Sequence, residues 1–542
     1  MTAPSRPTTG AVSLRKDSGP PFARILIANR GEIAVRIIRT CRELGVETVA
    51  VYSDVDSDAL HVQAADVAVR LGPAPAVESY LRADAIIEAA RQTGAQAIHP
   101  GYGFLSERAD FAHAVTDAGL VFIGPRPDAI EALGDKLAAR RTAQAAGVPV
   151  VPGTFDAAPV ERPEDVAAIV TAAEAIGFPL LVKASAGGGG RGMRLVSKVS
   201  ELPAALAAGS AEAAAAFGDG SVYLEREVRP ARHIEVQLLG DAEGTIVALG
   251  ERDCSIQRRH QKLVEESPAP GLTADERAEL HELAIRAAQA ANLHNAATAE
   301  FLFDTARRFW FLEVNARLQV EHGVTELVTD LDLVAEQMWI AAGVPLSEAV
   351  RDAGAAAVAP RRHAIEVRLA AEDPSRAFAP SPGRVGVWQM PSGPGVRVDT
   401  AIRADERVPP DYDPMIAKIM TVGPDRGSAI DRMRRALDEV AVTGIQTTLP
   451  FDRALIRDAA FAAGDVSTDW VETRWDGEGR RSDALAVAAR VAAGAIAPVA
   501  GGGPGVDAAA RPDERGPSLR KDAAGSGWRD AGRTAATERW PR

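Results

Sequence analysis

The chain has 542 residues, more than one hydrophobic core usually serves, so we expect several domains. Its composition, 46% hydrophobic and 5% aromatic, is typical of a folded, helix-rich globular protein. The formal net charge of −13 argues against nucleic acid or an anionic membrane as the main partner, because both select for basic surfaces.

The N-terminal segment and the cysteine content bear on location. Two cysteines are too few for a disulfide framework or a zinc site, which fits a reducing compartment. Residues 1–21 contain no apolar core of signal-peptide length, and no later stretch reaches the ~20 apolar residues of a membrane helix. We expect a cytoplasmic protein with a disordered N-terminus. Organelle targeting is the alternative, although the prolines of this segment oppose an amphipathic helix.

Strand and helix patterns alternate in the first part of the chain. Residues 23–28 have a buried-strand pattern, residues 31–44 have helical spacing, and residues 46–53 form a second strand pattern. The alternation predicts a doubly wound, Rossmann-like parallel sheet over residues 22–135. The first strand leads into NRGEI and not into G-x-G-x-x-G, so we expect this domain to be mainly architectural.

The end of the chain divides into a folded part and a polar tail. Strand patterns such as HAIEVRLAA, followed by a helix over residues 428–440, predict an α+β domain at 346–474. Residues 475–542 contain one short amphipathic stretch and then a Pro/Gly-rich run, and we interpret them as a linker or disordered tail.

A glycine-rich loop, KASAGGGGRGM, lies between two strand patterns in the middle region, residues 136–345. Consecutive glycines let backbone amides approach phosphate oxygens, but no G-K-[ST] follows as in a Walker A loop. The loop therefore predicts a mobile lid over a nucleotide at about residues 153–226, with Lys183 able to reach a phosphate. A flexible surface hairpin is the alternative.

Residues 313–321 read as one strand with a polar face made by every second residue. If the preceding hairpin is symmetric about its turn, Glu300 lies opposite Glu313, and two facing carboxylates need a cation. With the amide of Asn315, these oxygen ligands suit Mg²⁺ or Mn²⁺. The alternative is a solvated polar face on an edge strand.

The second half of that strand suits an anion. Arg317 offers a planar fork for a carboxylate-like group, and Glu321 is a candidate base beside it; bicarbonate has the matching shape and one proton to lose. Upstream, the run QRRHQK concentrates donors, although a basic surface run explains it equally well. His233 alternates with apolar residues in HIEVQ and is expected on the polar side.

Taken together, these motifs resemble the ATP-grasp ligases and, more narrowly, the biotin carboxylases that open the acetyl-CoA, propionyl-CoA and pyruvate carboxylase reactions. The resemblance runs from about residue 22 to residue 474. Its motifs are GDK (134–136), KASAGGGGRGM (183–193), HIEVQ (233–237), ERDCSIQRRHQK (251–262), EFLF (300–303) and EVNARLQVEH (313–322).

The resemblance implies a role for each matching residue. Those implied to contact ATP are Lys136, Lys183, Gly189, Gly190, Glu225, Arg226, Glu227, Val228, His233, Gln257, His260, Glu300 and Glu313. Mg²⁺ or Mn²⁺ is implied on Glu300, Glu313 and Asn315. Bicarbonate is implied on Lys262, Arg317, Gln319, Val320 and Glu321, with Glu321 as base and Arg368 steadying the enolate of biotin. Lys262, Arg317, Glu321 and Arg368 would be the catalytic set.

The implied reaction is ATP-dependent carboxylation of biotin through carboxyphosphate. The sequence has no A-M-K-M-like biotin site, so biotin is expected on a carrier protein or on a portion absent from this chain, with a carboxyltransferase as second partner. The chain is then a stand-alone subunit or a shortened α chain. The resemblance also suggests a homodimer through the first and third domains. The matching positions are Arg36, Arg39, Glu43 and Arg397, with Pro394 where some members carry an aromatic residue.

Two positions depart from the family pattern: Ala186 replaces a loop glycine, and Gly323 stands where proline is expected and would loosen the backbone beside Glu321. Another ATP-grasp ligase, such as a carbamoyl-phosphate synthetase half or a purine-pathway carboxylase, is the alternative enzyme. A catalytically silent assembly subunit is the alternative outside enzymes.

Overall fold

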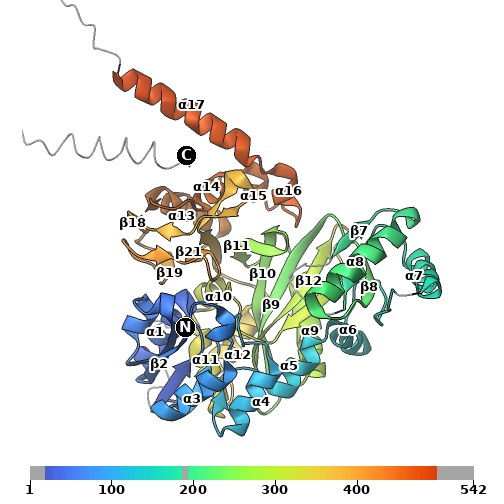
Figure 1. The fold of residues 1–542 in the computed structure, drawn as a ribbon, viewed down its shortest axis with the longest axis horizontal. Coiled ribbons are helices and arrows are strands. Elements are labelled where there is room, and N and C mark those ends of the chain that lie inside the picture. Colours follow the sequence, from blue (N-terminus) through green and yellow to red (C-terminus); the bar gives the residue numbers. More distant parts are fainter. Residues whose placement is uncertain (1–18, 161, 186–192, 497–542) are drawn as a thin grey trace, which may run out of the picture.

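The computed structural model describes residues 19–160, 162–185 and 193–496 (Figure 1). The predicted loop residues Ala186, Gly189 and Gly190 lie outside the described residues, as do residues 1–18 and the tail from 497. Within the described residues, no helix is both long and apolar enough to cross a bilayer.

The first region contains the predicted parallel sheet, in the order β3-β2-β1-β4-β5. Its strands are β1 Arg24–Ile27, β2 Glu47–Ser53, β3 Val67–Gly72, β4 Ala97–His99 and β5 Val121–Phe122. Its helices are α1 Gly31–Leu44, α2 Leu60–Ala64, α3 Ala83–Thr93, α4 Ala109–Asp117, α5 Pro127–Gly134 and α6 Lys136–Ala145. The helical spacing of α1 ends at Gly45, whose φ of 73° is the left-handed conformation that closes a helix.

A small lobe follows, made of α7 Pro163–Ile176, α8 Leu202–Phe217 and a three-stranded sheet in the order β7-β6-β8. Its strands are β6 Leu180–Ala184, β7 Arg194–Val196 and β8 Val222–Arg226. The lobe has a hydrophobic core of its own, and it projects from the right of the molecule (Figure 1). An independent core lets such a lobe move as a unit.

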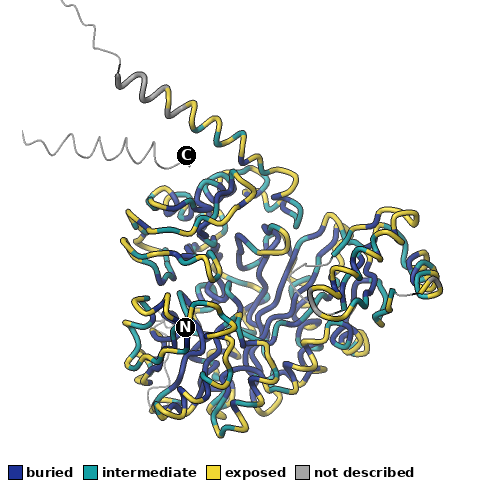
Figure 2. Tube along the Cα trace, viewed as in Figure 1, coloured by how far each residue is buried: buried dark blue, intermediate teal, exposed yellow. Residues whose placement is uncertain are grey.

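The largest sheet has eight antiparallel strands in the order β13-β12-β9-β10-β11-β14-β21-β19. These are β9 Ala231–Gly240, β10 Ile246–Arg258, β11 Gln261–Ser267, β12 Asn295–Asp304, β13 Phe309–Asn315, β14 His363–Ala370, β19 Val396–Thr400 and β21 Met415–Gly423. Because β11 pairs with β14, one sheet joins the middle and C-terminal regions. Its strands are the most continuously buried part of the chain (Figure 2).

Helices flank this sheet on both sides in chain order. They are α9 Ala274–Ala290, α10 His322–Thr329, α11 Leu333–Ala341, α12 Glu348–Ala356, α13 Arg426–Glu439, α14 Leu449–Leu455, α15 Ala459–Ala463 and α16 Trp470–Arg474. Short strand pairs complete the C-terminal region: β15 Glu372–Asp373 with β16 Ala379–Pro380, β17 Gly383–Arg384 with β20 Arg407–Val408, and β18 Trp388–Gln389 with β22 Ala441–Val442. The segment expected to be a linker begins with a projecting helix, α17 Gly477–Ile496 (Figure 1).

Glu266 on β11 ties the two halves of the large sheet together. Its carboxylate accepts hydrogen bonds from Arg426 at 2.6 and 3.0 Å and lies 2.7 Å from His363 Nε2. Burial alone would raise the pKa of Glu266, but these two partners lower it to about 2. The ionised form is thus held more tightly in the folded protein than in the unfolded chain.

Glu266→Gln is therefore expected to cost stability in a pH-dependent way. A lowered carboxyl pKa contributes stability above the unfolded value of 4.5, and this stability is lost as the pH falls toward 2. We expect the variant to be roughly 3 kcal/mol less stable at pH 7 and the gap to narrow below about pH 4.5. Urea unfolding of both proteins from pH 7 to pH 3.5 measures this gap; a gap independent of pH would contradict the assignment.

Candidate active site

The face of the large sheet beneath α10 carries rows of charged residues set by strand register. One row crosses four strands, because Glu313 pairs with Glu300, Glu300 with Glu235, and Glu235 with Arg252. A second row runs from Glu265 through Glu366 to Met420, and a third pairs Arg368 with Lys418. Directly opposed residues on neighbouring strands share a face. The sheet therefore gathers charges from distant parts of the sequence.

The predicted pairing of Glu300 with Glu313 is present, but symmetry of the hairpin does not produce it. The pairs next to the turn, such as Phe301 with Phe311, would lead to Leu312 opposite Glu300. A register shift between Glu300 and Phe301 adds one residue on β13 and brings Glu313 opposite instead. A β-bulge thus creates the facing carboxylates.

The prediction of one strand over residues 313–321 is wrong beyond its first part. Strand β13 ends at Asn315, the chain then turns, and Glu321 immediately precedes α10. Arg317 reaches Glu107 of the first region with a 2.8 Å hydrogen bond and also bonds Gln319 at 2.8 Å. These contacts to other elements hold an irregular connection, although the alternation in sequence resembles that of a strand.

Lys262 on β11 is the centre of the site. Its Nζ donates to Glu321 at 2.7 Å and to Glu300 at 2.8 Å, and it also bonds Glu235. Burial alone would lower the pKa of Lys262, but the three carboxylates raise it well above its usual value. One buried ammonium therefore balances carboxylates from three separate elements.

The proposed metal ligands lie at the end of the first row. Glu300 is buried, lies 3.2 Å from His233 Nε2, and accepts a 2.9 Å bond from the Asn315 amide. Glu313 is partly exposed and lies 3.2 Å from Lys136 Nζ. All three side chains present oxygen atoms at one end of the cleft, and lysines offset the carboxylate charge. This donor set fits a hard divalent cation.

The lobe contributes a second lysine–carboxylate group. Lys183 on β6 bonds Glu225 on β8, and Arg140 of α6 lies 2.9 Å from the same carboxylate. Burial alone would raise the pKa of Glu225, but Lys183 and Arg140 lower it. The cations of this group lie near Lys136, whose pKa Glu313 raises. Basic side chains thus extend from the large sheet to the lobe.

The residues predicted for an anion meet at the β13–α10 connection. Gln319 is buried and its Nε2 has no hydrogen-bond partner among the described residues. The Val320 carbonyl accepts a 2.8 Å bond from Lys418. Beside them, the Arg317 fork holds the Glu107 carboxylate at 2.8 Å. A side-chain carboxylate thus stands where a small planar anion is expected.

Glu321 is held from both sides. Its Oε1 accepts from Lys262 and its Oε2 accepts from Arg368 Nη2 at 2.9 Å, while Arg368 Nε donates to Glu265 at 2.6 Å. Burial alone would raise the pKa of Glu321, but Lys262 and Arg368 lower it well below its usual value. The carboxylate is therefore ionised and ready to accept a proton.

Other predicted residues lie at the edges of this cluster. Residues 225–228 lead from the lobe into β9, and the amides of Arg226 and Glu227 bond the carbonyls of Pro152 and Pro179. Gln257 is buried opposite Lys262 on β10, and His260 is exposed in the β10–β11 turn. The described contacts give these residues no further role.

The predicted dimer residues make contacts within the chain. Arg36 is buried and bonds Glu326 and Asp332, and Arg397 bonds Glu326 at 2.7 Å. Arg39 is partly exposed. The dimer interface stays a prediction.

The site also contains residues that the motifs did not single out. Glu235 and Arg252 are fully buried and bonded at 2.6 Å, and Lys418 is fully buried beside Glu32 at 3.1 Å. Period-two alternation could have found Glu235 in HIEVQ, because it shares a face with His233. Nothing local signals Glu107.

Gly323 lies in the first turn of α10, directly above the second charged row. A Cβ atom at this position would overlap Met420 Sδ and lie 3.3 Å from Glu366 Oε2. The Met420 side chain thus occupies the space that a residue at 323 would need. Packing against Met420 restrains this turn, where we had expected a looser backbone.

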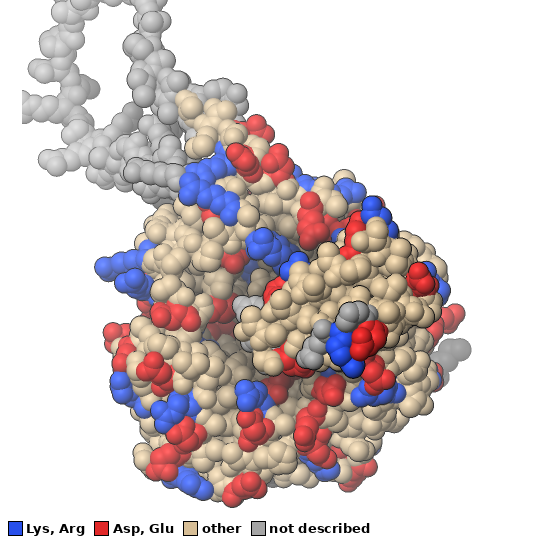
Figure 3. All heavy atoms as spheres, turned by 45° about the vertical axis from the view of Figure 1, so that its right-hand side comes forward, with Lys and Arg blue, Asp and Glu red and all other residues tan. Residues whose placement is uncertain are grey.

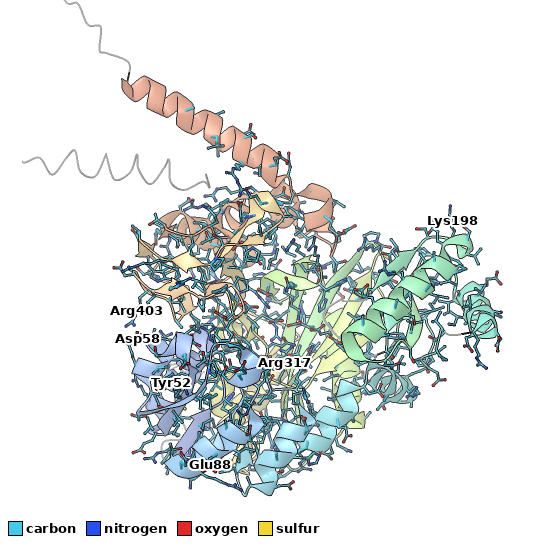
Figure 4. All side chains as sticks on the ribbon, in the orientation of Figure 1. Tyr52, Asp58, Glu88, Lys198, Arg317 and Arg403 are labelled. Atoms are coloured by element: carbon cyan, nitrogen blue, oxygen red, sulfur yellow. The ribbon has the colours of Figure 1, made fainter. Side chains whose placement is uncertain are left out.

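The surface is hollowed between the lobe and the rest of the molecule, with charged residues of both signs along the edge (Figure 3). Arg317 lies between the first region and the large sheet, whereas Lys198 lies at the far end of the lobe (Figure 4). The charged face therefore lies at the junction of the three parts.

Comparison with known proteins covers almost the whole described chain. The matching family models are described as Biotin carboxylase, N-terminal domain (residues 21–130), Carbamoyl-phosphate synthase L chain, ATP binding domain (135–349) and Biotin carboxylase C-terminal domain (366–473). The biotin carboxylase of Nostoc sp. is 49% identical over 451 residues, which are 83% of this chain and 99% of that protein. Biotin carboxylase 1 of Bacillus subtilis is 48% identical over 451 residues, 83% of this chain and 98% of that protein.

Solved structures agree. A biotin carboxylase complex from Campylobacter jejuni has a TM-score of 0.79 and 43% identity, covering 83% of this chain and 98% of that one. The biotin carboxylase domain dimer of Hydrogenobacter thermophilus 2-oxoglutarate carboxylase, in complex with MgADP, ADP and bicarbonate, has a TM-score of 0.78 and 42% identity, covering 83% and 97%.

The fold and the site together define an ATP-dependent ligase of the ATP-grasp class. The matching models on both sides of the ATP-binding region and the curated relatives narrow this class. The chain belongs to the biotin carboxylase family. The resemblance inferred from the motifs is confirmed, and the comparisons give no support to the alternatives.

Proposed function

We propose that the charged face beneath α10 carboxylates biotin with bicarbonate and ATP, as the first half-reaction of an acetyl- or propionyl-CoA-type carboxylase. The observation that supports this most is the position of Lys262, bonded to Glu300 on one side and to Glu321 on the other. It joins the oxygen donors suited to a metal and nucleotide with the groups suited to bicarbonate.

ATP and its metal would occupy the side nearer the lobe. Lys136, Lys183, His233, Gln257, His260, residues 225–228 and loop residues Gly189 and Gly190 would hold the nucleotide, and Glu300, Glu313 and Asn315 the Mg²⁺ or Mn²⁺. Bound metal would screen the charge of the phosphoryl group in transfer. The lysines on Glu225 and Glu313 are placed to turn toward phosphate oxygens when the lobe closes.

Bicarbonate would bind to Lys262, Arg317, Gln319, Val320 and Glu321. Arg317 exchanges the Glu107 carboxylate for the anion, and the unpartnered Gln319 Nε2 gains an acceptor. Glu321 takes the proton as a bicarbonate oxygen attacks the γ-phosphorus and the bond to ADP breaks. Because its pKa is low, this transfer needs the neighbouring cations to stabilise the doubly charged anion.

Carboxyphosphate then releases CO₂ and phosphate beside biotin. Arg368 would steady the negative oxygen of the ureido ring as its nitrogen loses a proton and bonds to CO₂. Closure of the lobe would keep water from the intermediate.

The deciding assay is ADP release with bicarbonate and Mg²⁺, with and without free biotin. We expect biotin to stimulate release and carboxybiotin to form. Absence of stimulation in folded protein would count heavily against the proposed function.

Arg368→Ala separates the two halves of the site. The variant removes the group facing biotin while Lys262 still holds Glu321, so carboxybiotin formation should fall about 100-fold or more and biotin-independent ADP release by less than about 10-fold. Both rates are measured on one preparation. An equal fall in both rates would mean that Arg368 and Arg317 do not have separate roles.

The partners follow from the reaction. We propose that a biotin carboxyl carrier protein and a carboxyltransferase act with this chain, and that the chain forms a homodimer, as the Hydrogenobacter domain does. A cytoplasmic location stays a prediction.

A further inference from the structure

Behind Arg368, two carboxyl groups occupy directly opposed positions on neighbouring strands. Glu265 on β11 pairs in register with Glu366 on β14, and both side chains are fully buried. Opposed residues of an antiparallel pair have β-carbons about 5 Å apart, so two ionised carboxylates here would repel strongly.

The hydrogen bonds of this pair are incomplete. Glu265 uses Oε1 to accept from Arg368 Nε at 2.6 Å, but its Oε2 has no partner among the described residues. Neither oxygen of Glu366 has a partner there either. Three buried acceptor atoms therefore lack donors, which is costly unless a proton supplies one.

The neighbouring charges do not offer a second cation. Lys418, the nearest lysine, is committed to Glu32 and to the Val320 carbonyl. The other ionisable groups around the pair are Arg368, Glu321, Lys262, Glu235 and, near Glu265, Asp452 of α14. Burial, opposed by Arg368, raises the pKa of Glu265 to about 7, and burial raises that of Glu366 well above its usual value.

We propose that Glu265 and Glu366 share one proton and act as the positioning element of Arg368. Protonated Glu366 donates to Glu265 Oε2, and Glu265 keeps one negative charge for Arg368 Nε. Since Nη2 stays on Glu321, the guanidinium is held at two points, and Nη1 makes no bond to the described residues. The inference rests on the proposed function only in that Nη1 then faces biotin.

The shared proton is tested without any activity measurement. The infrared difference between wild type and Glu366→Gln at pH 7 should contain the C=O stretch of one protonated carboxylic acid, which titrates away as the pH rises. If Glu366→Gln does not fold, Glu265→Gln replaces it, because the band must shift when its acceptor becomes an amide. Loss of ionised carboxylate bands alone in either difference spectrum overturns the proposal.

The positioning role is tested by kinetics. Glu265→Gln removes the charge that holds Arg368 and should lower kcat/KM for free biotin about 10- to 100-fold, with biotin-independent ADP release within about threefold. Glu366→Gln mimics the protonated acid and should cost at most about threefold. Glu88→Gln, the same change at an exposed glutamate of α3, is the matched control (Figure 4).

Two results would overturn the positioning role. One is a loss in Glu366→Gln as large as in Glu265→Gln, and the other is an equal loss of ADP release and biotin turnover in Glu265→Gln. If wild type shows no biotin stimulation, the proposed function fails, whereas the infrared result still decides the shared proton.

Discussion

Lys262→Met should be the most damaging single substitution in the protein. It leaves Glu235, Glu300 and Glu321 buried without their shared cation, and an unpaired buried charge typically costs about 3–5 kcal/mol. It also removes a donor to the reacting anion, so ADP release should fall by at least about 1,000-fold. Urea unfolding and the ADP assay, run where the variant is folded, measure the two effects.

The control is Lys198→Met, the same change at an exposed lysine of the lobe (Figure 4). We expect its stability to stay within about 0.5 kcal/mol of wild type. If Lys262→Met lost no more stability than this control, Lys262 would not be the cation that balances the site.

Glu321→Gln should have the second largest effect, and on rate more than on stability. Glutamine keeps the shape and still accepts from Lys262 or Arg368, but it cannot take a proton. Bicarbonate-dependent ADP release should fall about 100- to 10,000-fold, the usual contribution of a general base. Steady-state rates at saturating ATP and bicarbonate measure this.

The KM for ATP supplies the contrast for Glu321→Gln. It should change by less than about threefold, because Glu321 lies on the bicarbonate side of Lys262. A large rise in that KM with little change in kcat would instead place Glu321 with the nucleotide.

Local sequence patterns predicted the parts of the fold that local forces determine. The helix at residues 31–44 has the predicted bounds because its apolar spacing stops at a glycine suited to a C-cap. The strands flanking the glycine loop were predicted for a similar reason, since apolar alternation and turn residues agree.

The active site was predictable only where one motif carries the chemistry. The facing pair of Glu300 and Glu313 depended on a bulge that no local pattern announces, so the right pairing followed from incomplete reasoning. The strand beyond Asn315 was wrong because partners such as Glu107 come from another region. Glu366 shares a face with Arg368 and could have been found, but its pairing with Glu265 requires the register of the sheet.

The contact between Gly323 and Met420 links two positions that are 97 residues apart in sequence, as their numbers show. Neither residue can be exchanged freely while the other stays, because a side chain at 323 and the thioether at 420 compete for one volume. Homologues with proline at the first position should therefore carry a shorter or differently branched residue at the second. The two sites are expected to covary, and grafting the proline alone into this chain would displace the helix that begins beside Glu321.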